Sequence, residues 1–136
     1  MLLSELATTL SSITGSNGNA SFDLEDMTDS RSCFAVARDG SGFALGCGAI
    51  RPFDANTAEM KRVYARDKNS GVGKHIVKFL EQRAVELGYS RIVLETRIVN
   101  EKAVSFYLRN GYTNIQNYGK YAGREEAVCF EKMLLS

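Results

Sequence analysis

The sequence contains few of the residues that build metal sites and disulfide frameworks. Among its 136 residues there is one histidine, His75, and there are three cysteines, Cys33, Cys47 and Cys129, at wide and irregular spacing. Because no C-x-x-C pair is present, the pattern supports neither a zinc ribbon nor a thioredoxin-like site. Each cysteine stands in an apolar stretch, where we expect a buried, reduced thiol. The sequence therefore predicts no metal site and a cytoplasmic location.

A surplus of charge of one sign and a long apolar run are also missing. Lys and Arg number 17 and Asp and Glu 16, so the net charge of +1 provides no electrostatic case for a nucleic-acid or membrane partner. No apolar run approaches the ~18 residues that span a bilayer, and the first residues lack the basic leader of a signal peptide. With 44% hydrophobic and 24% charged residues, the chain has the composition of a globular protein. We expect one domain over residues 1–136.

Hydrophobic spacing and turn residues predict an alternation of helices and strands. Leucine and isoleucine fall on one helical face between residues 2 and 14, which predicts a helix there, and residues 21–32 have no clear pattern. The chain is then expected to form strands over 33–38, 43–50 and 58–65, a helix over 72–87, a strand over 91–96, a helix over 101–110, and strands over 112–118 and 126–134. Because a helix connects the strands over 58–65 and 91–96, we expect these two to be parallel, with antiparallel hairpins on either side.

A glycine-rich turn joins a strand to the longest predicted helix. It reads Lys68-Asn69-Ser70-Gly71-Val72-Gly73-Lys74. Two glycines one residue apart let a ligand approach the backbone, and the amides and dipole of a helix N-terminus favour an anion such as phosphate. His75 and Ile76 stand where a Walker A loop and a dinucleotide fingerprint need other residues, which counts against a nucleotide-binding regulatory domain. By itself the turn is either an anion site or simply the start of a helix.

A second motif follows the turn. It reads Asn100-x-x-Ala103-x-x-Phe106-Tyr107-x-x-x-Gly111-Tyr112. The two segments resemble motifs A and B of the GNAT superfamily, the acetyl-CoA-dependent N-acetyltransferases, with Lys68 where motif A usually has Gln or Arg. Because both motifs occur in order and with intact spacing, the chain is identified as similar to this family over about residues 33–134.

The resemblance implies a GNAT-like mixed, mostly antiparallel sheet of about six strands, with a central splayed parallel pair flanked by helices. Family members usually begin with a strand before the first helix. Since helical spacing here starts at Leu3, we expect that strand to be missing. The final strands of such domains often take part in dimers. The apolar run over residues 127–130 therefore favours a homodimer, unless it fills the core of a single chain.

The resemblance also implies the reaction and the residues that bind the cofactor. The reaction is transfer of an acetyl group from acetyl-CoA to a primary amine of an unidentified acceptor, either a small molecule or a protein amine. The pantetheine arm would pair with Val63 and Ala65 between the splayed strands, and Asn100 would bind its amide region or serve as a plain helix N-cap. The pyrophosphate would bind the turn, through Lys68, Ser70, Gly71, Val72, Gly73 and Lys74.

The resemblance assigns the proton transfers to one tyrosine and one carboxylate. Tyr107 would contact the cofactor and act as general acid for the leaving thiolate, or else it only packs in the core. Glu59 is the first candidate for the general base, with Glu95 or water as alternatives, and Glu59 could instead be ion-paired with neighbouring Lys61 or Arg62. The segment over residues 118–121 lines the acceptor pocket or forms a strand end. The alternative to an enzyme is a non-catalytic acyl-CoA-binding module.

Overall fold

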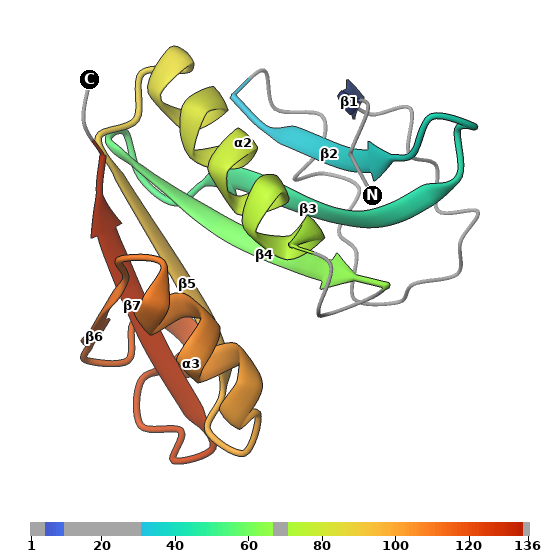
Figure 1. Ribbon diagram of the computed structural model, residues 1–136. Helices are drawn as coiled ribbons and strands as arrows, with labels where there is room; N and C mark the ends of the chain where they lie inside the picture. Colours follow the sequence, from blue (N-terminus) through green and yellow to red (C-terminus); the bar gives the residue numbers. More distant parts are fainter. Residues whose placement is uncertain (1–4, 10–30, 67–70, 135–136) are drawn as a thin grey trace.

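The computed structural model of the chain describes residues 5–9, 31–66 and 71–134. The elements are, in chain order, β1 (Glu5–Thr9), β2 (Cys33–Arg38), β3 (Ala44–Pro52), β4 (Thr57–Ala65), α2 (Val72–Glu86), β5 (Arg91–Arg97), α3 (Glu101–Arg109), β6 (Thr113–Ile115), the 3-10 turn η2 (Gly119–Tyr121) and β7 (Ala127–Met133) (Figure 1). Within these residues, neither helix is long and apolar enough to cross a bilayer.

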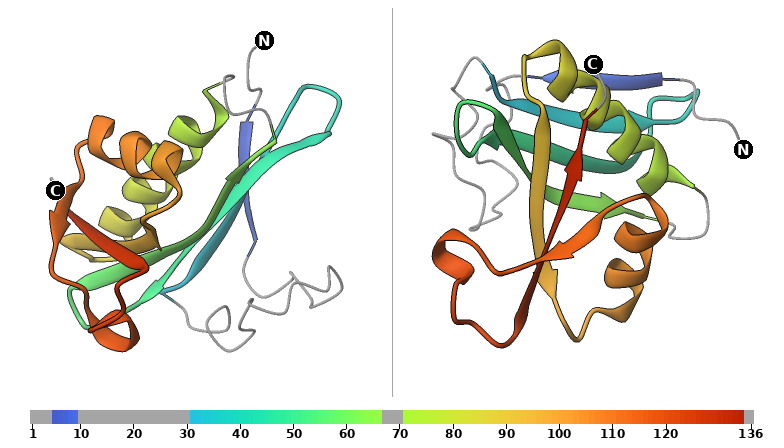
Figure 2. Two further views of the ribbon diagram at one scale, coloured as in Figure 1. Left: turned by 90° about the horizontal axis from the view of Figure 1, so that it is seen from below. Right: turned by 90° about the vertical axis from the view of Figure 1, so that its left-hand side faces the viewer.

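The described strands form one seven-stranded sheet, in the order β1-β2-β3-β4-β5-β7-β6. Strands β4 and β5 are parallel and are connected through α2, whereas every other neighbouring pair in this sheet is antiparallel. Both helices lie on the same side of the sheet and share one hydrophobic core with it (Figure 2). The predicted mixed, mostly antiparallel sheet with a central parallel pair is confirmed.

The prediction for the N-terminus is wrong. Residues Glu5–Thr9 form strand β1 and not part of a helix over 2–14, so the strand that was expected to be missing is present. It pairs antiparallel with β2, from Glu5 opposite Arg38 to Thr9 opposite Phe34. Hydrogen bonds to the otherwise open edge of β2 outweigh the local helical spacing, which carries no information about a strand so distant in sequence. The residues over 21–30 lie outside the described residues.

The predicted strand over 112–118 is reduced to the three residues of β6. The Asn117 side chain donates hydrogen bonds to the carbonyl oxygens of Arg124 and Ala127, at 2.9 and 3.1 Å, which folds the chain into a loop that carries η2. Strand β7 lies between β5 and β6, and Cys129 and Phe130 are buried by the chain itself. The apolar run over 127–130 therefore needs no partner to explain it, and the homodimer stays a prediction.

Helix α2 packs unusually close to strand β3. A Cβ atom at Gly46 would lie 2.4 Å from the carbonyl oxygen of Tyr64 and 2.9 Å from Cδ1 of Ile76, so only glycine fits there. Val72 and Leu80 are buried on the same helix stripe as Ile76. This close contact places the first turn of α2 beside the end of β4.

A buried polar network ties α2 to the C-terminal part of the sheet. The Tyr112 hydroxyl donates to Oε2 of Glu81 at 2.8 Å, and the Lys132 ammonium lies 3.2 Å from the same carboxylate. Lys132 also donates to the Asn110 carbonyl oxygen at 3.0 Å. Burial, followed by the Glu81 charge, raises the pKa of Tyr112 well above its ordinary value, so the hydroxyl stays protonated and donates.

We expect Glu81→Ala to lower the free energy of unfolding by about 1–3 kcal/mol, because Tyr112 and Lys132 lose their shared acceptor. The matched control is Lys78→Ala. Lys78 is exposed and lies 3.9 Å from Glu81, so its loss is expected to cost less than about 0.5 kcal/mol. Urea unfolding followed by circular dichroism measures both. Equal effects of the two substitutions would contradict a stabilising role of the buried network.

Candidate active site

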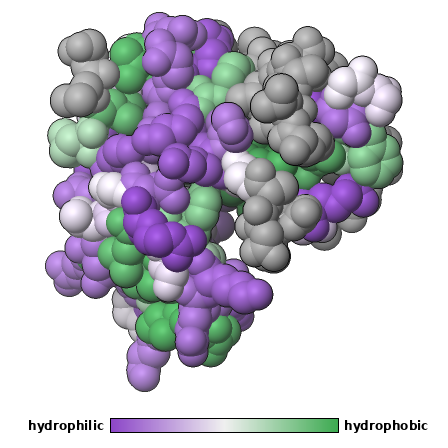
Figure 3. Space-filling model, viewed as in Figure 1, coloured by the Kyte–Doolittle hydropathy of each residue, from purple (hydrophilic) through white to green (hydrophobic). Residues whose placement is uncertain are grey.

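The site begins where the two central parallel strands separate. The β4–β5 register runs from Thr57 opposite Arg91 to Met60 opposite Leu94 and ends there, although β4 continues to Ala65 and β5 to Arg97. Figure 1 shows β4 and β5 side by side at their beginnings and apart at their ends. In the space-filling view the outline of the molecule is notched between the two parts that these strands carry (Figure 3).

A β-bulge in β4 accounts for the separation. Between the pairs Ala49–Lys61 and Cys47–Tyr64, β4 has one residue more than β3, and Arg62 within this step has a φ of 65°. A bulge bends its strand and increases the local twist, so β4 turns away from β5 beyond Lys61. Val63 and Ala65 lie in this diverging part of β4, where the ladder to β5 has ended.

The N-terminus of α2 meets the end of β4. Gly71 is the N-cap residue with a φ of 83°, a left-handed conformation that favours glycine, and the first helical bond runs from the His75 N–H to the Gly71 carbonyl oxygen. The amides of Gly73 and Lys74 precede that bond, and the first turn contains no acidic residue. These features suit an anion at residues 71–74. Lys68 and Ser70, also predicted to bind it, lie outside the described residues.

Helix α3 borders the same place from the other side. A Cβ at Gly73 would lie 3.6 Å from the Phe106 ring and 3.9 Å from Cβ of Ala65, so β4, α2 and α3 converge here. Asn100 is the N-cap of α3, where its Oδ1 accepts a hydrogen bond from the Ala103 N–H at 3.2 Å. The end of β4, the first turn of α2 and Phe106 of α3 thus meet, while Asn100 caps the beginning of α3.

Tyr107 lies on α3 with its ring in the core. Its ring stands edge-on to Phe106 and Tyr112, at centroid distances of 5.1 and 5.5 Å, and its exposed fraction is 8%. Burial raises the pKa of Tyr107 to about 12, so the phenol is protonated at neutral pH. Its hydroxyl forms no hydrogen bond with a described residue. Every fully buried side-chain oxygen among the described residues has a hydrogen-bond partner, so this hydroxyl is not fully buried. Without an acceptor among the described residues, the hydroxyl is left to donate to a ligand.

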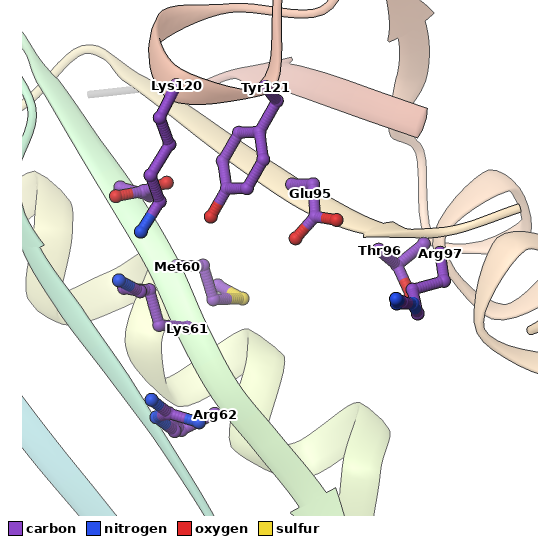
Figure 4. A pocket seen from close by; sticks show the side chains of 9 residues that line it. Met60, Lys61, Arg62, Glu95, Thr96, Arg97, Lys120 and Tyr121 are labelled. Carbon is purple, nitrogen blue, oxygen red and sulfur yellow. The ribbon is translucent and has the colours of Figure 1, made fainter. Parts of the chain in front are cut away.

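A pocket of about 500 Å³ opens where β4 and β5 diverge. Side chains alternate along a strand, and Met60 and Leu94 face the core shared with the helices, so Glu59 and Glu95 face the other side of the sheet. Figure 4 shows Tyr121 and Lys120 reaching into the pocket from the η2 turn, opposite the strand residues. The lining residues are Glu59, Met60, Lys61, Arg62, Glu95, Thr96, Arg97, Lys120 and Tyr121.

The Glu59 carboxylate is held on both oxygens. Glu59 has an exposed fraction of 3%, and its Oε1 lies 2.9 Å from Nη2 and 3.1 Å from Nε of Arg51 on the neighbouring strand. The Tyr118 hydroxyl donates to Oε2 at 2.7 Å. The sequence analysis predicted Lys61 or Arg62 as the ion-pair partner of Glu59 and missed Arg51. The antiparallel register of β3 and β4, which sets Arg51 opposite Glu59, is the signal that identifies it.

Glu95 has a different environment. Burial raises the pKa of this carboxyl above its ordinary value, and the neighbouring Glu59 charge acts in the same direction, opposed by Arg97, Lys120 and Lys61. It forms no ion pair with any described residue. A half-buried carboxylate of raised pKa that faces a pocket is suited to accept a proton.

Comparison with protein families agrees with this geometry. The model of the Acetyltransferase (GNAT) family matches residues 5–112. An uncharacterized N-acetyltransferase of Schizosaccharomyces pombe is 41% identical over 86 residues, which are 61% of the chain, and the match spans about half, 53%, of that relative. An IAA acetyltransferase of Azospirillum brasilense is 27% identical over 98% of the chain and 88% of its own length.

Solved structures share the fold. A protein from Klebsiella pneumoniae, described as an acyl-CoA N-acyltransferase, superposes with a TM-score of 0.83 at 25% identity, covering 96% of the chain and 97% of that protein. A GNAT family acetyltransferase from Elizabethkingia anophelis with acetyl-CoA bound superposes with a TM-score of 0.74 at 17% identity, covering 96% and 97%.

Proposed function

The chain belongs to the GNAT acetyltransferase family, and on this basis we propose that it transfers the acetyl group of acetyl-CoA to a primary amine bound in the pocket between β4 and β5. The observation that carries the proposal is the divergence of these strands beyond Met60, which joins the helix side of the sheet to a pocket lined by Glu59 and Glu95. A thioester bound from the helix side and an amine bound from the pocket can meet in this gap.

We assign cofactor binding to the residues around the gap. The diverging backbone of Val63 and Ala65 would hydrogen-bond the pantetheine arm as an added strand does. The N-terminus of α2, over residues 71–74, would bind the pyrophosphate, and the Asn100 carboxamide still has its NH₂ group for the arm while Oδ1 caps α3. Acetyl-CoA supplies the reactive thioester.

We assign the acid role to Tyr107. Its phenol would hydrogen-bond the sulfur as the C–S bond breaks and would supply the proton of the leaving thiol. With a pKa of about 12 it stays protonated until the thiolate forms. Complete transfer to a thiolate, whose thiol has a pKa of ~8.5, is uphill by ~5 kcal/mol, so the phenol contributes most as a charge-stabilising donor in the transition state.

We propose that the pocket carboxylates deprotonate the acceptor. A primary ammonium must lose a proton before its nitrogen can form the new C–N bond. Arg51 and Tyr118 contact both oxygens of Glu59, so its carboxylate is less accessible to the acceptor ammonium than the sequence analysis assumed. The raised pKa of Glu95 and its freedom from ion pairs among the described residues favour Glu95 as the proton acceptor, with Glu59 holding the ammonium by its charge.

Acetyl-CoA is expected to raise the melting temperature of the protein, because at 100 times its dissociation constant a ligand adds about 2.7 kcal/mol to stability.

Gly73→Val should reduce the affinity for acetyl-CoA at least tenfold, since the added methyl groups enter the space between Phe106, Ala65 and the cofactor. Gly40→Val, in an open turn between β2 and β3, is the control and should bind normally. Calorimetric titration measures all three proteins. Unchanged affinity in Gly73→Val would place the cofactor elsewhere.

Tyr107→Phe is expected to lower kcat by ~10²-fold while the KM for acetyl-CoA changes little, because the lost hydrogen bond forms mainly in the transition state. The ring and its packing against Phe106 and Tyr112 remain, so the melting temperature should change little. Thiol release from acetyl-CoA measures turnover. Full turnover in this variant would mean that Tyr107 only packs in the core, which is the alternative role that the sequence allows.

The two carboxylates are distinguished by the pH dependence of their variants. Glu95→Gln should lower kcat/KM strongly near pH 7, and its defect should shrink as pH rises and more of the amine is already neutral. In the unsubstituted protein, activity needs ionised Glu95. The acid limb should therefore lie above the ordinary carboxyl pKa of 4.5, because the pKa of Glu95 is raised. Glu59→Gln should show a defect that changes less with pH. The reverse pattern would identify Glu59 as the base.

A further inference from the structure

The charges that line the pocket are unequal. Four cationic side chains, Lys61, Arg62, Arg97 and Lys120, stand with two carboxylates. Arg51, which does not line the pocket, already pairs with Glu59, so one of the two negative charges is balanced from outside. Among the described residues, the pocket therefore offers an acceptor cationic as well as anionic partners.

The inference depends on two of these cations, Arg97 and Lys120. Both are exposed, and neither forms an ion pair with a described residue. Arg97 follows Glu95 by two positions on β5, so it lies on the same face of the sheet about 7 Å farther along the strand. Lys120 faces them from the η2 turn, beside Tyr121, whose ring centroid lies 5.5 Å from its ammonium (Figure 4).

The turn that presents Lys120 is well anchored. The Tyr118 hydroxyl binds Glu59 at 2.7 Å, and the Tyr118 ring stands edge-on to Phe53 at 5.1 Å. From the other end of the turn, Nε of Arg124 donates to the carbonyl oxygen of Lys120 at 3.1 Å. The backbone of Lys120 is thus held beside the pocket by contacts on both sides of η2.

We infer that the acceptor is a small zwitterion, an amine with an anionic group a few ångströms away, whose ammonium binds at Glu95 and whose carboxylate or phosphate binds Arg97 or Lys120, the cations on either side of Glu95 (Figure 4). The inference rests on the proposed acetyl transfer and adds the substrate class. A volume of about 500 Å³ suits a molecule the size of an amino acid. Polyamines and other polycationic acceptors would meet repulsion from Arg97 and Lys120.

The test uses matched acceptors in the thiol-release assay. Each amino acid is compared with its carboxamide and with its decarboxylated amine, and phosphoethanolamine is compared with ethanolamine. The carboxylate or phosphate member should have a kcat/KM at least tenfold above its uncharged counterpart. The preferred anion, carboxylate or phosphate, is the one whose acceptor has the larger ratio of kcat/KM to that of its uncharged counterpart. Equal values within the pairs would overturn the substrate class and leave the acetyl transfer standing. If no amine is acetylated, both proposals fall.

Variants locate the anion site. Arg97→Gln or Lys120→Gln, whichever removes the cation that binds the anion, should lower kcat/KM for the anionic acceptors about 10- to 100-fold, the scale of one charge-assisted hydrogen bond, and leave the uncharged counterparts within about twofold. No such loss in either variant would overturn the inference. Arg109→Gln, at an exposed arginine at the end of α3 outside the pocket, is the control and should not distinguish the two members. An effect confined to the KM for acetyl-CoA, or the same loss with both members of each pair, would overturn the inference.

Discussion

The rest of the site depends on one extra residue in β4. The bulge at Arg62 ends the parallel ladder at Met60 and Leu94, although both strands continue. A continuous ladder would close the gap between the strands and separate the helix side of the sheet from the pocket side. The cost is a non-glycine residue in the left-handed region, of order 1–3 kcal/mol, which the pairing of β4 with β3 on its other edge compensates.

The sheet divides the work between its two faces. On the helix side, apolar residues of β4 and β5 pack under α2 and α3, and the first turn of α2 lies beside the end of β4 and Phe106 of α3. On the opposite face the same strands carry Glu59 and Glu95. The alternation of side chains along a strand therefore separates the groups proposed for the thioester from those proposed for the amine, with only the backbone of the diverging strands between them.

Two carboxylates with such different neighbours are suited to different tasks. Glu59 is held by Arg51 and Tyr118, so its carboxylate is fixed in place and anchors the η2 turn. Glu95 has no such partners among the described residues, and burial raises its pKa above the ordinary carboxyl value, which suits the proton-accepting role proposed for it. The contacts of Glu59 also hold the η2 turn that carries Lys120 beside the pocket.

The sequence by itself determined the features that depend on nearby residues. The start of α2 after a glycine-rich turn, the Asn100 cap of α3, the extents of both helices and the parallel pairing of β4 with β5 followed from spacing, capping and the right-handed crossover rule. Only the tertiary structure decided that residues 5–9 form β1 and that Arg51, not Lys61 or Arg62, holds Glu59. Tertiary contacts also decided that burial raises the pKa of Glu95, because pairing, register and burial arise between segments far apart in the chain, where local periodicity carries no information.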